Sequence, residues 1–185
     1  MKKILVQTSN WKFIVPVFLC AAYCIYSFQV AQDQMSEICG HKVEMLDVRQ
    51  GYSLEEINLF FTELQSEGRE IHRRSTSITD SIFAIANVLL FILIYAFFLR
   101  KITHQNSNWL YLSLLPLILM VSDFMENFNT IRLLDSFPEL DSASVQYASQ
   151  ITSTKLFLVD IALGLLLLLG IIFLLKWGLS KLRNN

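Results

Sequence analysis

Four long apolar runs alternate with polar segments along this chain. Each run is close to the roughly 20 residues that an α-helix needs to cross about 30 Å of hydrocarbon. Because a lipid-exposed backbone must satisfy its own hydrogen bonds, apolar runs of this length predict helices. We therefore expect an all-α fold, an antiparallel four-helix transmembrane bundle that forms one membrane domain over residues 1–185. The expected spans are residues 13–30, 82–99, 109–128 and 156–175.

The segment between the first two runs, residues 31–79, is too long to be a simple connector. Ser53 is followed three residues later by Glu56, which is the pattern of a capping box at a helix start. Apolar residues then recur at i, i+3, i+4 and i+7. We expect an amphipathic helix over about 53–67, ended or broken at Gly68, that lies on the bilayer or over the mouth of the bundle. The predicted apolar stripe comprises Ile57, Phe60, Phe61 and Leu64.

The third and fourth spans carry two further local signals. Pro116 has no N–H to donate to the carbonyl of Leu112, so the third span should bend there. Between these spans, residues 129–154 form a second polar loop. Pro138 and Ser142 are typical of a helix start, so the chain should become helical near Ser142 and run straight into the last span.

Composition supports a membrane protein. Hydrophobic residues make up 54 % of the 185, and the mean hydropathy is +0.46, too apolar for an ordinary soluble domain of this size. A net charge of −1 creates no field that would attract nucleic acid, and we expect no nucleic-acid partner. The three cysteines form no disulfide framework, and no glycine-rich phosphate loop occurs, so we expect no cofactor.

Basic residues in the flanks predict the orientation, because they favour the cytoplasmic side. Both termini and the 100–108 turn should be cytoplasmic, and the loops 31–79 and 129–154 should face outward. The first run is about 18 residues long and has no A-x-A-like cleavage site after it, so we interpret it as an uncleaved span. The flanking basic residues are Lys2, Lys3, Lys12, Arg100, Lys101, Lys176, Lys181 and Arg183.

Ionisable residues from three expected spans lie at one height. Counted at about 1.5 Å per residue from the cytoplasmic ends, they fall between about 21 and 32 Å, near the outer edge of the hydrocarbon. In the third span, four polar residues spaced i, i+3, i+4 and i+7 share one helix face, which should point into the bundle because lipid cannot solvate it. The layer comprises Asp80, Asp123, Glu126, Lys155 and Asp160, and the face comprises Asp123, Glu126, Asn127 and Thr130.

One interpretation of this layer is structural. Lys155 would offset Glu126 or Asp123, Asn127 and Asn87 would bond between helices, and Arg69 or Arg73 from the outward loop would cap what remains. The chain would then be an integral membrane protein whose polar layer holds the bundle together. Its loop 31–79 would be presented to a lipid or protein partner.

The alternative is catalytic. Asp123 and Asp160 on neighbouring helices would form an aspartyl dyad that activates water, with Glu126 beside it. Substrate-binding candidates are Arg69, Lys155, Asn127 and Asp80. The reaction would be hydrolysis or group transfer on a lipid or a membrane peptide. His72 with Asp80, Asp123 and Glu126 offers one histidine among hard carboxylates, and we expect no metal site there.

The order of these residues resembles a family of uncharacterised bacterial four-span membrane proteins. Its pattern is a capped helix beginning with Tyr, then Gly-Arg, an Asp opening span two, Asp-x-x-Glu-Asn closing span three and Lys opening span four. His72 departs from it, where the family pattern has Tyr. The resemblance covers about residues 52–160 and implies the four-helix fold and a bacterial inner membrane, but no activity. The matching residues are Tyr52, Gly68, Arg69, Asp80, Asp123, Glu126, Asn127 and Lys155.

Overall fold

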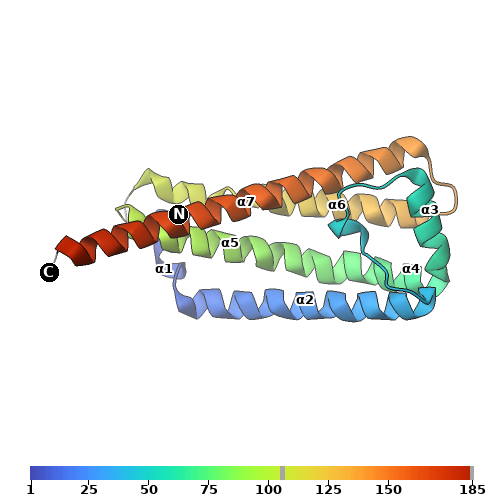
Figure 1. The fold of residues 1–185 in the computed structure, drawn as a ribbon, viewed down its shortest axis with the longest axis horizontal. Helices are drawn as coiled ribbons and strands as arrows, with labels where there is room; N and C mark the ends of the chain where they lie inside the picture. Colours follow the sequence, from blue (N-terminus) through green and yellow to red (C-terminus); the bar gives the residue numbers. More distant parts are fainter. Residues whose placement is uncertain (105–106, 184–185) are drawn as a thin grey trace.

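Long helices lying side by side dominate the structure, a computed structural model that describes residues 1–104 and 107–183 (Figure 1). No strand occurs in these residues, which confirms the predicted all-α bundle. Both chain ends lie at one end of the bundle, hereafter the terminal end, and α3 and α4 close the other, the capped end. In chain order the elements are α1 (Lys2–Thr8), α2 (Trp11–Cys39), η1 (Leu46–Val48), α3 (Leu54–Glu63), α4 (Gln65–Arg74), η2 (Ser75–Asp80), α5 (Ser81–Ile102), η3 (Asn108–Leu114), α6 (Leu117–Ser136) and α7 (Ser142–Arg183).

Four helical stretches are long and apolar enough to cross a membrane, which makes the chain a multi-pass membrane protein. Each contains one of the four spans expected from the sequence. The helices are longer than the apolar runs because backbone hydrogen bonding continues past the point where hydropathy falls. The four stretches are Trp11–Cys39, Gln65–Ile102, Asn108–Ser136 and Ser142–Leu182.

α5 is the central helix of the bundle. It packs against α1, α2, η3, α6 and α7. In its apolar window 44 % of the residues are buried, compared with 6 % for α7. Most of the apolar surface of α7 therefore faces whatever surrounds the protein.

Pro116 changes the type of helix rather than only its direction. Residues Asn108–Leu114 form a 3₁₀-helix, and the α-helix α6 starts directly after Pro116. The carbonyl of Leu112 accepts a hydrogen bond from the N–H of Leu115 at 3.1 Å. The expected single α-helix over 109–128 is therefore wrong in its first turns, because the carbonyl that proline leaves open is satisfied by tighter i→i+3 bonding.

Residues 43–64, hereafter the cap, fold over the mouth of the bundle. The capping box is confirmed: the Ser53 hydroxyl accepts the N–H of Glu56 at 3.2 Å, and the Glu56 carboxylate accepts the N–H of Ser53 at 2.7 Å. Of the two predicted positions for this helix, the structure has the one over the bundle. The stripe residues Ile57, Phe60, Phe61 and Leu64 are at most 5 % exposed and pack with Met35, Leu133, Leu134 and Val145.

The predicted break at Gly68 is wrong. The helix breaks at Gln65, whose φ is +54°, and Gly68 lies inside α4. A Cβ at Gly68 would come within 3.1 Å of the Leu64 side chain and 3.6 Å of Ile38 on α2. The glycine is thus needed for close packing of α4 rather than for a helix end.

Hydrogen bonds tie the cap to the helices below it. The N–H of Val43 donates to the Ser36 hydroxyl on α2 at 3.0 Å, and the N–H of Tyr52 donates to the Ser149 hydroxyl on α7 at 2.9 Å. Gly51 has φ +152°, and a Cβ there would lie 3.3 Å from the Ser149 oxygen. The absence of a side chain at Gly51 therefore lets the cap backbone approach α7 closely.

α7 begins where the sequence predicted and continues unbroken through the last span. Its first turn is capped by Asp141, whose carboxylate accepts the N–H of Ser144 at 2.8 Å. Hydrogen bonds from Ser144 hold the pKa of Asp141 below its usual value. Part of the predicted turn 100–108, residues 105 and 106, lies outside the described residues.

Candidate functional site

A cluster of polar side chains, hereafter the polar core, lies inside the bundle just below the cap. It draws on five separate elements, and most of its members are almost fully enclosed. Such groups are costly to bury and are expected to have a structural or functional reason. The polar core comprises Asp47 of η1, His72 of α4, Asp80 of η2, Asp123, Glu126 and Asn127 of α6, and Lys155 of α7.

Lys155 is the cation of the polar core. Its ammonium pairs with the Glu126 carboxylate and lies 3.7 Å from Oδ1 of Asp123. The three side chains are 9 %, 2 % and 11 % exposed, so water screens these interactions little. The lysine therefore joins α7 to α6 through a buried ion pair.

The predicted polar face of the third span is confirmed. Asp123, Glu126, Asn127 and Thr130 are all buried, at 2 % to 8 % exposed. One full helix face of α6 therefore supplies the polar core, as the i, i+3, i+4, i+7 spacing requires.

A π-helical segment shapes the side opposite α6. The six residues Ser75–Asp80 connect α4 to α5 without a break and leave Ser75, Thr76 and Asp80 buried. A π turn contains more residues per turn than an α-helix and so shifts which residues face inward. It brings Asp80 to the same small cavity as Glu126 and Asn127.

His72 lies between the polar core and the aromatic side chains of the cap. Its ring is 5.7 Å from the ring of Phe60, and its Nδ1 lies 3.4 Å from the hydroxyl of Thr76. The side chain is 2 % exposed. The cap thus contributes both the roof of the core and the packing that orients its histidine.

The cavity inside the polar core has a volume of about 10 Å³, which is room for about one water molecule. Among the described residues, several buried polar atoms at this cavity have no hydrogen-bond partner in the protein, including His72 Nε2, Ser75 Oγ, Asn127 Nδ2 and Glu126 Oε1. Buried polar groups are almost always paired, so a bridging water is the partner that fits these atoms and this space. The cavity is too small for a lipid or a peptide.

Acidic groups outnumber basic ones in the polar core. Four carboxylates, those of Asp47, Asp80, Asp123 and Glu126, accompany Lys155. The guanidinium of Arg49 is engaged elsewhere: it lies 4.7 Å from the Phe60 ring centroid and donates to the carbonyl of Glu44. The core therefore depends on its lysine.

Two predicted site residues lie elsewhere. Arg69 donates to the carbonyl of Phe61 at 2.7 Å and lies over the ring of Phe137, so it secures the cap rather than a carboxylate. Asp160 is exposed on α7 and does not line the cavity, which corrects the expected dyad with Asp123. Lys155 and Asp160 are five residues apart, which separates them by about 140° around the helix, and both cannot face the same core.

Asp47 was not predicted. It belongs to a short 3₁₀ turn in a segment without helical or strand periodicity, so no pattern assigned its direction. The sequence signal that could have located it is its apolar neighbours Val43, Met45 and Leu46, all of which are buried in the structure. His72 was not predicted to belong to the polar layer. No group of three or more His, Cys, Asp or Glu side chains in residues 1–104 and 107–183 is arranged to hold a metal ion.

Comparisons with protein-family models, curated proteins and solved structures found no match to this chain. The resemblance to uncharacterised bacterial four-span proteins stays a prediction. What the polar core does must therefore be inferred from its geometry.

Proposed function

We propose that this chain is a non-catalytic integral membrane protein whose polar core locks the four spans to the cap, and whose cap binds a protein partner outside the hydrocarbon. The observation that carries the proposal is the small size of the cavity in the polar core. A site with room for about one water, roofed by the cap, has no space for a substrate. The ion pairs of Lys155 on α7 with Asp123 and Glu126 on α6 hold these two helices together, which is a structural role.

The orientation of the protein is part of the proposal. No acidic residue occurs in residues 1–32, 81–122 or 161–185, and these stretches carry eight basic residues. They contain the terminal end, whereas all sixteen acids fall between residues 33 and 160. The positive-inside tendency then places the termini in the cytoplasm and the cap outside, as in a bacterial inner membrane.

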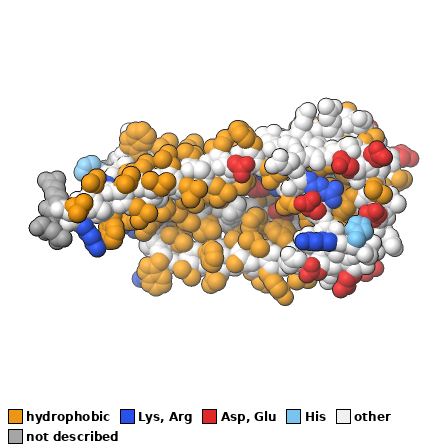
Figure 2. Space-filling model, in the orientation of Figure 1, with side chains coloured by type: hydrophobic (Ala, Val, Ile, Leu, Met, Phe, Trp, Pro, Cys, Tyr) orange, Lys and Arg blue, Asp and Glu red, His pale blue; other side chains and the backbone are white. Residues whose placement is uncertain are grey.

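The outer surface of the cap carries a groove of about 250 Å³, hereafter the cap groove. Figure 2 shows most of the visible acidic side chains gathered at this end of the molecule, hydrophobic ones over the middle of the visible face, and Lys or Arg again at the terminal end. Both signs of charge line the groove around the half-exposed Leu59. Mixed charge around an apolar contact is typical of protein interfaces. The groove is lined by His41, Lys42, Val43, Glu44, Arg49, Glu56, Leu59, Phe60 and Glu63.

The test compares stability with a cellular phenotype. Asp123→Asn, Glu126→Gln and Lys155→Met are assayed for thermal unfolding in detergent and for complementation of a deletion strain. A structural lock requires all three variants to lose stability. Variants that unfold like the wild type but fail to complement would overturn the proposal in favour of a working chemical site.

The unpartnered atoms of the core favour one second candidate, a membrane-embedded hydrolase or transferase. His72, Glu126 and Asn127 face the cavity with buried atoms that lack protein partners, which is a common property of reactive sites. The acids would be Asp123 and Glu126, with Asp80 rather than the exposed Asp160 beside them. This function requires the cap to lift, and the same three variants distinguish it from the first.

A further inference from the structure

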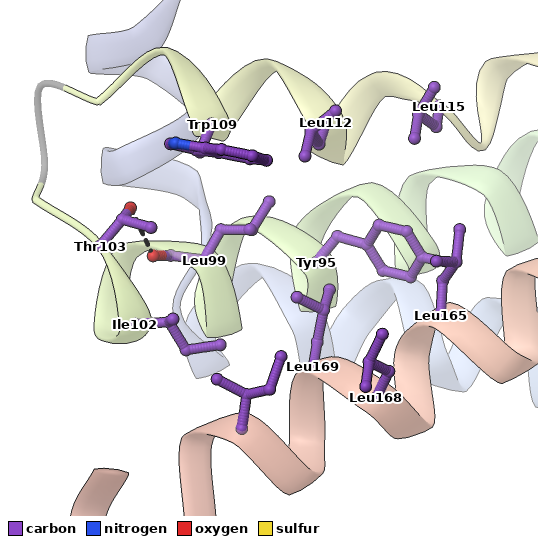
Figure 3. A pocket seen from close by; sticks show the side chains of 11 residues that line it. Tyr95, Leu99, Ile102, Thr103, Trp109, Leu112, Leu115, Leu165, Leu168 and Leu169 are labelled. Atoms are coloured by element: carbon purple, nitrogen blue, oxygen red, sulfur yellow. Dashed lines mark hydrogen bonds between the residues drawn. The ribbon is translucent and has the colours of Figure 1, made fainter.

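An apolar cavity of about 360 Å³ lies near the terminal end, far along the bundle from the polar core. Figure 3 shows Trp109 and Leu112 on one wall, Leu168 and Leu169 on the other, and Leu99 and Tyr95 between them. The three walls come from η3, α7 and α5. Among the residues that the structure describes, no charged one lines the cavity.

A second apolar space adjoins this cavity on the side toward the middle of the bundle. This space of about 150 Å³ shares Tyr95, Leu115 and Leu165 with the cavity and reaches Leu158. The two together follow α7 from Leu158 to Ile172, which is about 21 Å at 1.5 Å per residue. Tyr95 forms a fixed floor, because its hydroxyl donates to the carbonyl of Ala162 at 2.6 Å. We call these two adjoining spaces together the acyl groove.

The dimensions of the acyl groove identify its occupant. It is longer than the roughly 15 Å of hydrocarbon in one leaflet, so it can hold an extended chain. A transmembrane helix of the same length and about 10 Å in diameter would occupy roughly 1,600 Å³, which is more than the space available. One flexible hydrocarbon chain fits, and a helix from a second copy does not.

Cationic and aromatic groups lie where the acyl groove reaches the terminal end of the bundle. The ammonium of Lys176 donates to the carbonyl of Ile102, a lining residue, at 2.6 Å. An ammonium has three N–H donors, so this bond leaves donors for an anion. Lys101 is exposed next to Ile102, and Trp109, which is 64 % exposed, is the type of residue found at headgroup level.

We propose that the acyl groove binds one acyl chain of an anionic phospholipid, with the lipid phosphate against Lys176 and Lys101. The apolar walls accept the chain, and the two lysines select a negative headgroup. The site shares no residue with the polar core or the cap groove, so it stands independently of the function proposed above.

The experiment measures lipid retained by the purified full-length protein. The protein in detergent is incubated with equal amounts of phosphatidylglycerol and phosphatidylcholine, and bound lipid is counted by native mass spectrometry. We expect the wild type to retain one phosphatidylglycerol in preference to phosphatidylcholine.

Leu168→Trp should fill the acyl groove, and Leu167→Trp is its matched control, because Leu167 is 69 % exposed and does not line the groove. Excluding even two methylene groups of the chain should lower retention about tenfold in Leu168→Trp. Retention should be unchanged in Leu167→Trp. Ile172→Trp, nearer the terminal end, repeats the test if Leu168→Trp does not fold.

Lys176→Gln tests the contribution of the lipid headgroup to binding separately from that of the acyl chain. It should lower the preference for phosphatidylglycerol about fivefold, the worth of one lysine near an anionic surface, while leaving a chain in the groove. Equal retention by Leu168→Trp and Leu167→Trp would overturn the proposal. So would a wild type that binds both lipids equally, or one that retains no lipid and forms a dimer that Leu168→Trp disrupts.

Discussion

The two ends of the bundle differ in the charge of their side chains and in how far their interior is enclosed. The capped end carries all sixteen acids of the chain. It gathers four of them around one lysine, three buried and Asp47 partly exposed, under a roof that leaves room for about one water. The terminal end has eight basic residues, no acid and an open apolar groove of about 360 Å³. Buried charge must be enclosed and paired, whereas apolar surface in a bilayer can stay open because lipid fills it at little cost.

This difference predicts where the molecule is sensitive to mutation. Changes in the polar core and under the cap should destabilise the whole protein. Changes at exposed positions should not, and the first three variants below are each compared with an exposed residue of the same type.

The largest effect is expected from Lys155→Met. Removing the cation leaves Glu126 and Asp123 buried without their partner, which typically costs about 3–5 kcal/mol. Thermal unfolding in detergent measures the loss, with exposed Lys12→Met as control. The double variant Lys155→Met with Glu126→Gln should recover part of the stability. If the double variant is no more stable than the single one, the two residues are not coupled.

The second-largest effect tests the packing of the cap on the bundle. Leu64 is fully buried in the cap, and Leu64→Ala should cost about 2–5 kcal/mol through lost contacts and a cavity. Leu59 lies on the same cap but is 59 % exposed, so Leu59→Ala should change the unfolding free energy by less than about 0.5 kcal/mol. Equal losses in the two variants would show that the cap does not pack on the bundle as described.

A smaller effect is expected at the start of α3. Ser53→Ala removes the hydroxyl that accepts the N–H of Glu56 and should cost about 1 kcal/mol. Exposed Ser66→Ala, within α4, serves as the control. The readout is again the unfolding temperature, and no difference between the two would contradict the role of the capping box.

The same capping box predicts a modest pH dependence. The backbone N–H of Ser53 stabilises the ionised Glu56 carboxylate, so the pKa of Glu56 lies below its ordinary value in the folded protein. A lowered folded pKa contributes stability above the ordinary value, and this contribution is lost as pH falls through the folded pKa. Between about pH 5 and pH 3 the unfolding temperature should therefore fall more in the wild type than in Glu56→Gln. Parallel curves would contradict this.

The smallest effect should come from Asp160→Asn. Because Asp160 is exposed on α7 and outside the polar core, its neutralisation should alter stability by less than about 0.5 kcal/mol and leave the phenotype intact. Thermal unfolding measures the stability, and complementation of the deletion strain measures the phenotype. Loss of the phenotype would instead support the dyad of Asp123 and Asp160, which the structure does not contain.

The sequence by itself determined the four spans, the capped amphipathic helix and the inward polar face of α6. These features follow from periodicity, hydropathy and short-range caps, which depend only on neighbouring residues. They were enough to predict that Asp80, Asp123, Glu126 and Lys155 belong to one layer, as the structure has them.

Tertiary structure alone decided which groups share the cavity. Asp47 reaches it because an aperiodic segment folds back over the bundle, and Asp80 reaches it through a π-helical segment that no local signal predicted. Asp160 lies at the expected height along α7, but its side chain is exposed and does not face the polar core. Height along a helix follows from counting residues, whereas direction around it depends on how the helices pack, and packing is a property of the whole chain.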